Sequence, residues 1–159
     1  MTRDEIIQAI DRDRADLLAV LEGLDETTIL TRPVVEQWTV KDLLGHMAVW
    51  HAVALQAIAD YRATGAPQQL ELNSDASVDD YNAQEAARRR DWPLERVREE
   101  WETSYRDLLA VVASLSEADL AALLPPPWES GTTLEYLIAI NSYKHDPDHL
   151  AQIRQRVSG

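Results

Sequence analysis

Apolar residues recur along this chain at the three- and four-residue spacing of an α-helix, and no stretch shows the alternation of a β-strand. The pattern is clearest between residues 6 and 21 and between residues 40 and 61, where one face of each stretch is apolar. We therefore predict an all-α fold in which four long helices form a four-helix bundle, with a long crossover between the second helix and the third.

Capping residues and helix breakers give approximate boundaries for these helices. Thr2 with Glu5, and Thr39 with Asp42, each place a hydroxyl three residues before a carboxylate, which is the pattern of a capping box. Gly65 is typical of a residue that ends a helix. The predicted long helices are 2–23, 39–63, 93–114 and 132–157, with connections at 24–37 and 64–77, a shorter helix at 78–90 and a helical turn at 116–119.

Two prolines bear on the last two long helices. Pro93 opens the third, and Asp91 just before it is the predicted N-cap. Pro147 lies inside the fourth, where proline removes a backbone donor and clashes with the preceding turn. We expect a kink or a restart there, with Asp146 as the N-cap of the restarted segment.

The length of 159 residues suits a single domain that spans residues 1–159. The net charge of −13 repels nucleic acid and anionic membrane surfaces, so neither is an expected partner. The compact basic run Arg88–Arg90 is interpreted as a solvated helix face. The first residues lack the apolar run of a signal peptide and no stretch is long enough to span a membrane, so a cytoplasmic location is expected.

The chain contains no Cys, so a metal ion would have to be held by His and carboxylate side chains. It has four histidines, and two of them, His145 and His149, are four residues apart on the last predicted helix. That spacing points both imidazoles the same way, as in helical zinc motifs. His46 and His51 both lie on the second helix but point apart, and the apolar stripe by itself favours His51 as the third ligand.

Two segments resemble the DinB/YfiT-like superfamily, and most of all its ClbS/DfsB branch. They are the run from Trp38 to His51, with its Gly-His and Trp-His pairs, and the run from Asn141 to Ile153. The segment Asp80-Tyr81-Asn82 resembles that branch as well. The resemblance implies that the metal ligands are His46, His145 and His149, which overrides the preference for His51, and that the protein forms a homodimer.

The resemblance also implies what such a site does. Three imidazoles leave a coordination position open on a divalent ion, with zinc and nickel the expected metals. The superfamily includes transferases and isomerases that use low-molecular-weight thiols, and the ClbS/DfsB branch includes a hydrolase of a reactive electrophile. The expected substrate is a small molecule, bound in a pocket lined by Trp50, His51, Tyr81, Asn82, Asn141 and Tyr143.

Three functions are consistent with these features. The first is a metal-dependent enzyme, a thiol transferase, isomerase or hydrolase that acts on a small electrophilic molecule. The second is a non-catalytic protein of the same fold that binds a small molecule or a metal. The third is an interaction protein that retains a polar cluster. Asp146 and Asp148 flank the ligands and are candidates to orient an imidazole or activate water, or are solvated carboxylates.

Overall fold

The structure is a computed structural model that describes residues 1–72 and 74–157. The regular structure in these ranges is helical, apart from two isolated β-bridges, Val35–Trp38 and Leu123–Thr133. The all-α prediction is therefore confirmed. The helices are α1 (Arg3–Glu22), α2 (Glu26–Thr31), α3 (Val40–Thr64), α4 (Asp75–Arg89), α5 (Leu94–Ala113), α6 (Glu117–Leu120), α7 (Leu134–Ile140) and α8 (Asp146–Val157).

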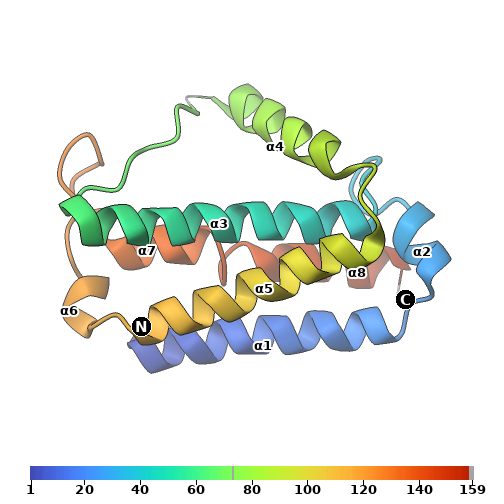
Figure 1. The fold of residues 1–159 in the computed structure, drawn as a ribbon, viewed down its shortest axis with the longest axis horizontal. Helices are drawn as coiled ribbons and strands as arrows, with labels where there is room; N and C mark the ends of the chain where they lie inside the picture. The colour runs from blue at the N-terminus through green and yellow to red at the C-terminus, as the bar shows by residue number, and fades with distance from the viewer. Residues whose placement is uncertain (73, 158–159) are drawn as a thin grey trace.

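The bundle is made of α1, α3, α5 and the pair α7 and α8, which follow one another along the fourth position (Figure 1). The long segment between α3 and α5 returns the chain to the end where α3 began, so α3 and α5 run side by side in the same direction (Figure 1). Helix α4 belongs to this crossover and stands away from the bundle (Figure 1). The predicted crossover is thus present, and it carries a helix of 15 residues.

The helix ends follow the capping pattern of the sequence. Thr2 with Glu5, and Thr39 with Asp42, form reciprocal capping boxes, and Gly65 ends α3 in the left-handed conformation with φ 76°. The prediction that Asp91 caps the next long helix is wrong. Pro93 occupies the N-cap position of α5 without a side-chain hydrogen bond.

The core lies between the long helices. Each contributes side chains that are almost wholly buried, among them Ile6, Ile10, Leu17, Leu43, Leu44, Met47, Trp101, Tyr105, Leu108, Leu134, Ile138 and Ile153. Burying one such large side chain stabilises the fold by about 1.5–3 kcal/mol. This rigid centre fixes α3 and α8, the two helices that carry the histidines.

The last predicted helix is broken before Pro147. Helix α7 ends at Ile140, residues 141–145 form turns, and α8 begins at Asp146. The restart expected near Pro147 is therefore confirmed, and residues 141–145, predicted as helix, are turns instead. Pro147 falls in the first turn of α8, where a missing N–H costs nothing. At the break, Asn141 donates to the carbonyl of Leu137 and Ser142 donates to that of Ile138.

Among residues 1–72 and 74–157, no helix combines the length and the apolar character that crossing a membrane requires.

Candidate metal centre

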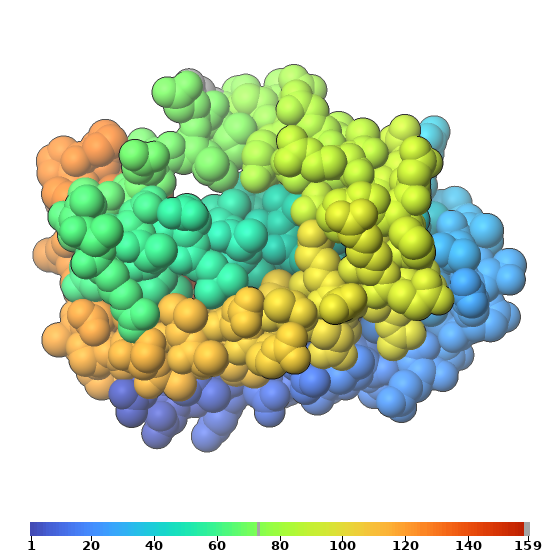
Figure 2. All heavy atoms as spheres, viewed as in Figure 1, coloured from blue at the N-terminus to red at the C-terminus, as the bar shows by residue number. Residues whose placement is uncertain are grey.

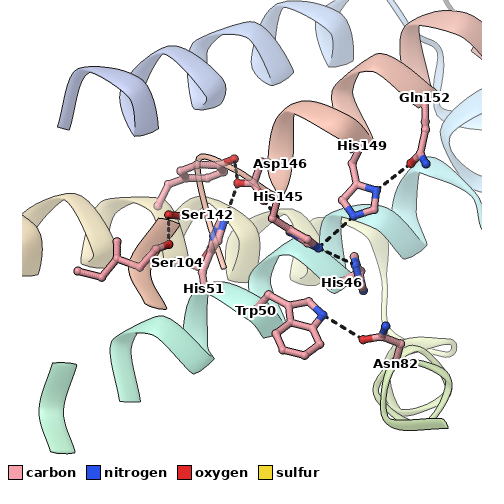
Figure 3. Close-up of polar contacts among 12 residues, drawn as sticks. His46, Trp50, His51, Asn82, Ser104, Ser142, His145, Asp146, His149 and Gln152 are labelled. Carbon is pink, nitrogen blue, oxygen red and sulfur yellow. Dashed lines mark hydrogen bonds and ion pairs between the residues drawn. The ribbon is translucent and has the colours of Figure 1, made fainter. Parts of the chain in front are cut away.

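Three histidines from two parts of the chain converge beside the break between α7 and α8 (Figure 3). His46 comes from the first turns of α3, His145 from the turn that precedes α8, and His149 from the first turn of α8 itself. The Nε2 atom of His145 lies 3.1 Å from Nε2 of His46 and 3.2 Å from Nε2 of His149. One nitrogen from each ring lies within 4.8 Å of the others.

Hydrogen bonds at the far side of two rings fix where their protons are. His145 Nδ1 lies 3.1 Å from Asp146 Oδ1, and His149 Nδ1 lies 2.8 Å from Gln152 Oε1. Both oxygens are acceptors, so both Nδ1 atoms carry the proton. The two Nε2 atoms then face each other at 3.2 Å. A metal ion placed between them would accept both lone pairs.

Burial favours the neutral form of two of the three rings, His46 and His149. Burial, together with the neighbouring His149 and His145, lowers the pKa of His46 to about 3. Burial and His145 also lower the pKa of His149. Neutral imidazole is the form that binds a metal ion. No proton therefore competes for His46 or His149 at neutral pH.

The donor set fits a divalent ion. Zinc–nitrogen bonds of about 2.0–2.1 Å in a tetrahedral site place two nitrogens about 3.3 Å apart. The two nitrogen–nitrogen distances of 3.1 and 3.2 Å are close to that value. Each of the three rings is partly exposed, so solvent or a ligand can reach the centre.

The fourth histidine, His51, is not part of this cluster. It is fully buried and lies 2.6 Å from Asp146 Oδ2 through Nε2 and 2.8 Å from Ser104 Oγ through Nδ1 (Figure 3). Ser104 donates its own proton to the carbonyl of Trp101, so it accepts a proton from His51 Nδ1. The apolar stripe correctly placed His51 inside the bundle, but its partner there is a carboxylate.

Asp146 joins this buried pair to the cluster. Its Oδ1 faces His145, and its Oδ2 accepts from Tyr105 and faces His51. Burial alone would raise the pKa of Asp146, but the charge of His51 and the three hydrogen bonds outweigh burial and lower it to about 2. Asp146 is therefore an ionised acceptor on both oxygens, and His51 donates to it from Nε2 as well. Asp148, the other flanking carboxylate, is exposed.

A second carboxyl near Asp146 has no such partners. Asp13 on α1 holds a buried Oδ2 atom without a hydrogen-bond partner. Burial and the charge of Asp146 raise the pKa of Asp13 to about 7.

Tryptophan rings flank His46 on both sides. Trp38 lies edge-on with its ring centre 5.0 Å from that of His46, and Trp50 lies at 6.4 Å. A tight turn holds Trp38, with Glu36 in the left-handed conformation at φ 52° and a Val34 N–H that donates to the Trp38 carbonyl at 2.7 Å. Sequence reasoning missed Trp38 as a site residue, although it opens the run that resembles the superfamily.

The expected pocket residues divide into two groups. Trp50, Tyr81 and Asn141 line a cavity of about 740 Å³ between α3, α4 and α7, and Asn82 accepts a hydrogen bond from Trp50 Nε1 at 3.0 Å. The other two lie elsewhere. His51 is in the buried pair, and Tyr143 is buried with its hydroxyl 3.2 Å from Glu135. Neither lines the cavity, because His51 lies on the buried face of α3 and Tyr143 lies buried in the break between α7 and α8.

Gly45 explains the Gly-His pair at the start of α3. A Cβ atom at this position would lie 2.9 Å from Cδ of Arg89, so the glycine lets the α4 side chain cross α3. Arg89 itself is mostly buried and pairs with Glu85 at 2.9 Å and with Glu100 at 2.7 Å. The interpretation of Arg88–Arg90 as a solvated face is therefore wrong for Arg89, which ties α4 to α5.

Solved structures with this fold match nearly the whole chain. An uncharacterised protein from Escherichia coli UTI89 is similar with a TM-score of 0.82 and 18% identity, covering 99% of this chain and 93% of its own. The colibactin self-resistance protein ClbS follows with a TM-score of 0.79 and 16% identity over 98% and 94% of the two chains. DfsB, described as a sibling lethal factor precursor, has a TM-score of 0.78 and 20% identity over 98% and 94%. These likenesses establish the fold. No curated protein matches the sequence.

The ClbS structure corrects one expectation. ClbS was solved in complex with a double-stranded DNA. Our use of the net charge to exclude nucleic acid as a partner is therefore wrong. A net charge averages over the whole surface, whereas contact with a phosphate backbone depends on local basic groups.

The sequence profile of the DinB superfamily matches residues 9–153, which include both histidine segments. The similarity to ClbS and DfsB agrees with the branch that the sequence motifs indicated. This chain belongs to the DinB superfamily.

Proposed function

We propose that this protein is a divalent-metal-dependent enzyme that acts on a small electrophilic molecule, with His46, His145 and His149 as the metal ligands. The facing lone pairs of His145 and His149 carry the proposal, since their hydrogen bonds to Asp146 and Gln152 leave both Nε2 atoms as acceptors. A cation satisfies both at once, and His46 completes a set of three neutral donors.

The residues around the cluster have separable tasks in this proposal. Asp146 orients His145, and Gln152 orients His149, so that each ring keeps its Nε2 lone pair toward the ion. Trp38 and Trp50 restrict the approach to His46 and exclude part of the solvent. A divalent ion held in this way lowers the pKa of a bound water or thiol, which is the chemistry that a hydrolase or a thiol transferase requires.

Metal content and metal affinity test the proposed ligand set. Protein purified without added metal should contain about one zinc or nickel ion per chain, and His149→Ala should weaken metal affinity by at least about a hundredfold. Asp148→Ala is the matched control, because Asp148 is an exposed neighbour of the same ligand on α8. If His149→Ala binds the metal as tightly as the wild type does, the proposed ligand set is wrong.

A thiol screen separates the two mechanisms. A transferase should be stabilised thermally by a low-molecular-weight thiol in a metal-dependent way, whereas a hydrolase should consume a small electrophilic probe such as an epoxide with water alone. If the metal-loaded protein binds such probes but turns over none of them, it is the non-catalytic binding protein that we propose as the alternative.

Association with double-stranded DNA is a second candidate, and the surface around Trp92 favours it. Arg88 and Arg90 are exposed at the end of α4, and the guanidinium of Arg96 lies 3.7 Å above the Trp92 ring. The ClbS complex shows DNA bound to a protein of this fold. DNA binding that weakens with added salt and is reduced by Arg90→Gln with Arg96→Gln would support it, and equal binding by this double variant would contradict it.

A further inference from the structure

The crossover forms an arch over α3, which we define as residues 66–72 together with α4. Figure 2 shows the surface hollowed between this arch and α3. A cavity of about 740 Å³ lies there, a volume typical of small-molecule sites. Helix α4 has no fully buried residue, so it does not pack on the bundle as the long helices do.

Polar ties at its two ends hold the arch in place. At one end, Arg89 pairs with Glu100, and Trp50 donates to Asn82. At the other end, the N–H of Gln68 donates to Asp60 at 3.2 Å, and Trp128 donates to the carbonyl of Pro67 at 2.8 Å. A concave, partly apolar space of this size beneath a tied arch has the form of a small-molecule site.

One end of the cavity lies at the histidine cluster. Trp50 lines the cavity, and its ring centre is 6.3 Å from that of His145. Asn141, which also lines the cavity, lies in the break that carries His145. The opposite end is at Asp60, ten residues further along α3, so the cavity extends for about 15 Å.

The lining determines the class of ligand. Three aromatic rings line the cavity, Trp50, Tyr81 and Trp128, together with aliphatic side chains from α3, the arch and α7. Uncharged amide side chains complete the lining, those of Gln56, Gln68, Gln69 and Asn141. The charged groups already have partners. Asp60 accepts from Gln56 and Gln68, and Arg89 pairs with Glu85. Within the described lining residues no basic group is left for an anionic ligand, and the net charge of −13 repels one.

We infer that the cavity under the arch binds an elongated, uncharged small molecule that carries both apolar and polar groups and whose reactive end lies at Trp50. The placement of the reactive end depends on the proposed function, whereas binding under the arch does not. The cavity therefore takes the electrophile.

Dye binding to the full chain tests this inference. Nile red is an elongated uncharged dye, and anilinonaphthalene sulfonate is an anionic dye of comparable size. Nile red should bind with one site per chain, and more tightly than the sulfonate. Val53→Trp fills the cavity and should weaken Nile red binding by at least about tenfold. Leu55→Trp is the matched control, because Leu55 is partly buried on the same helix but faces the groove between α3 and α5. It should leave binding unchanged.

His149→Ala separates this inference from the proposed function, since it should lose the metal and keep Nile red binding. Circular dichroism checks that each variant is folded, and Ala57→Leu is a second, smaller filling change in the same cavity if Val53→Trp unfolds the protein. Equal Nile red affinity in the filled variant and in the wild type would overturn the site. Tighter binding of the sulfonate would overturn the ligand class.

Discussion

His51 and Asp146 form a wholly buried pair, with Nε2 of the ring 2.6 Å from Oδ2 of the carboxylate. The other oxygen of Asp146 faces His145, so one carboxylate belongs to both the buried pair and the candidate metal centre. The orientation of a proposed ligand thus depends on a histidine from another helix that cannot itself reach the ion.

Asp146→Asn should weaken metal binding by about 10- to 100-fold, because the amide is a poorer acceptor for the Nδ1 proton of His145. Isothermal titration with Zn²⁺ measures the change. Asp148→Asn is the control, since Asp148 is exposed beside the same ligands. Equal losses in the two variants would mean that charge near the site matters and the hydrogen bond does not.

His51→Phe should destabilise the protein by about 3–5 kcal/mol, because it leaves the Asp146 carboxylate buried and unpaired. Urea unfolding measures the difference. Adding Asp146→Asn to His51→Phe should recover part of the loss, since the unpaired charge is then removed. A double variant no more stable than the single one would show that the pair is not coupled in this way.

Asp13→Asn should stabilise the protein at pH 8 by about 1 kcal/mol. The pKa of Asp13 is raised to about 7 from 3.8, so the folded state holds a proton that the unfolded chain has lost. This group therefore costs stability increasingly as pH rises from 3.8 through 7. The gain in Asp13→Asn should vanish near pH 4, and Asp11→Asn, an exposed change on α1, should show no gain at either pH.

The metal-free protein should lose stability through His46 as pH falls. The pKa of His46 is lowered from 6.5 to about 3, so below pH 6.5 the unfolded chain takes up a proton that the folded chain does not. Between pH 6.5 and 4 this should cost on the order of 2–3 kcal/mol. Asp13 acts in the opposite direction over part of this range, so the comparison is between wild type and His46→Asn after chelation. The free energy of unfolding of the variant should fall less steeply with decreasing pH than that of the wild type. Identical pH dependences of the two proteins would contradict the neutral buried state of His46.

The sequence predicted the parts of the fold that depend on local patterns. Capping boxes at Thr2 and Thr39 and the left-handed Gly65 are set by neighbouring residues, so they could be read directly. The break at residues 141–145 could not be predicted from local patterns. Side chains of Asn141 and Ser142 donate to the backbone carbonyls at the end of α7, in place of the backbone N–H groups of a continuing helix. Pro147 gave the signal for a restart but not its extent.

The candidate site was predictable only in part. Spacing identified His145 and His149, and the resemblance placed His46 beside them, as the structure does. Periodicity favoured His51 over His46, because it detects burial but not which ring meets Asp146 across the bundle. The position of the arch, the contact of Trp38 with His46 and the burial of Asp13 arise from contacts between distant segments. No local sequence pattern predicts them. The metal, the homodimer and the turnover stay predictions.

Anomalous diffraction from crystals of protein purified without added metal tests the central claim most directly. Data above and below the zinc and nickel absorption edges give the identity and position of any ion. We predict one anomalous peak bonded to Nε2 of His46, His145 and His149. A structure in which the three rings hold no metal after growth with excess Zn²⁺, or in which the peak lies on other residues, would contradict the account.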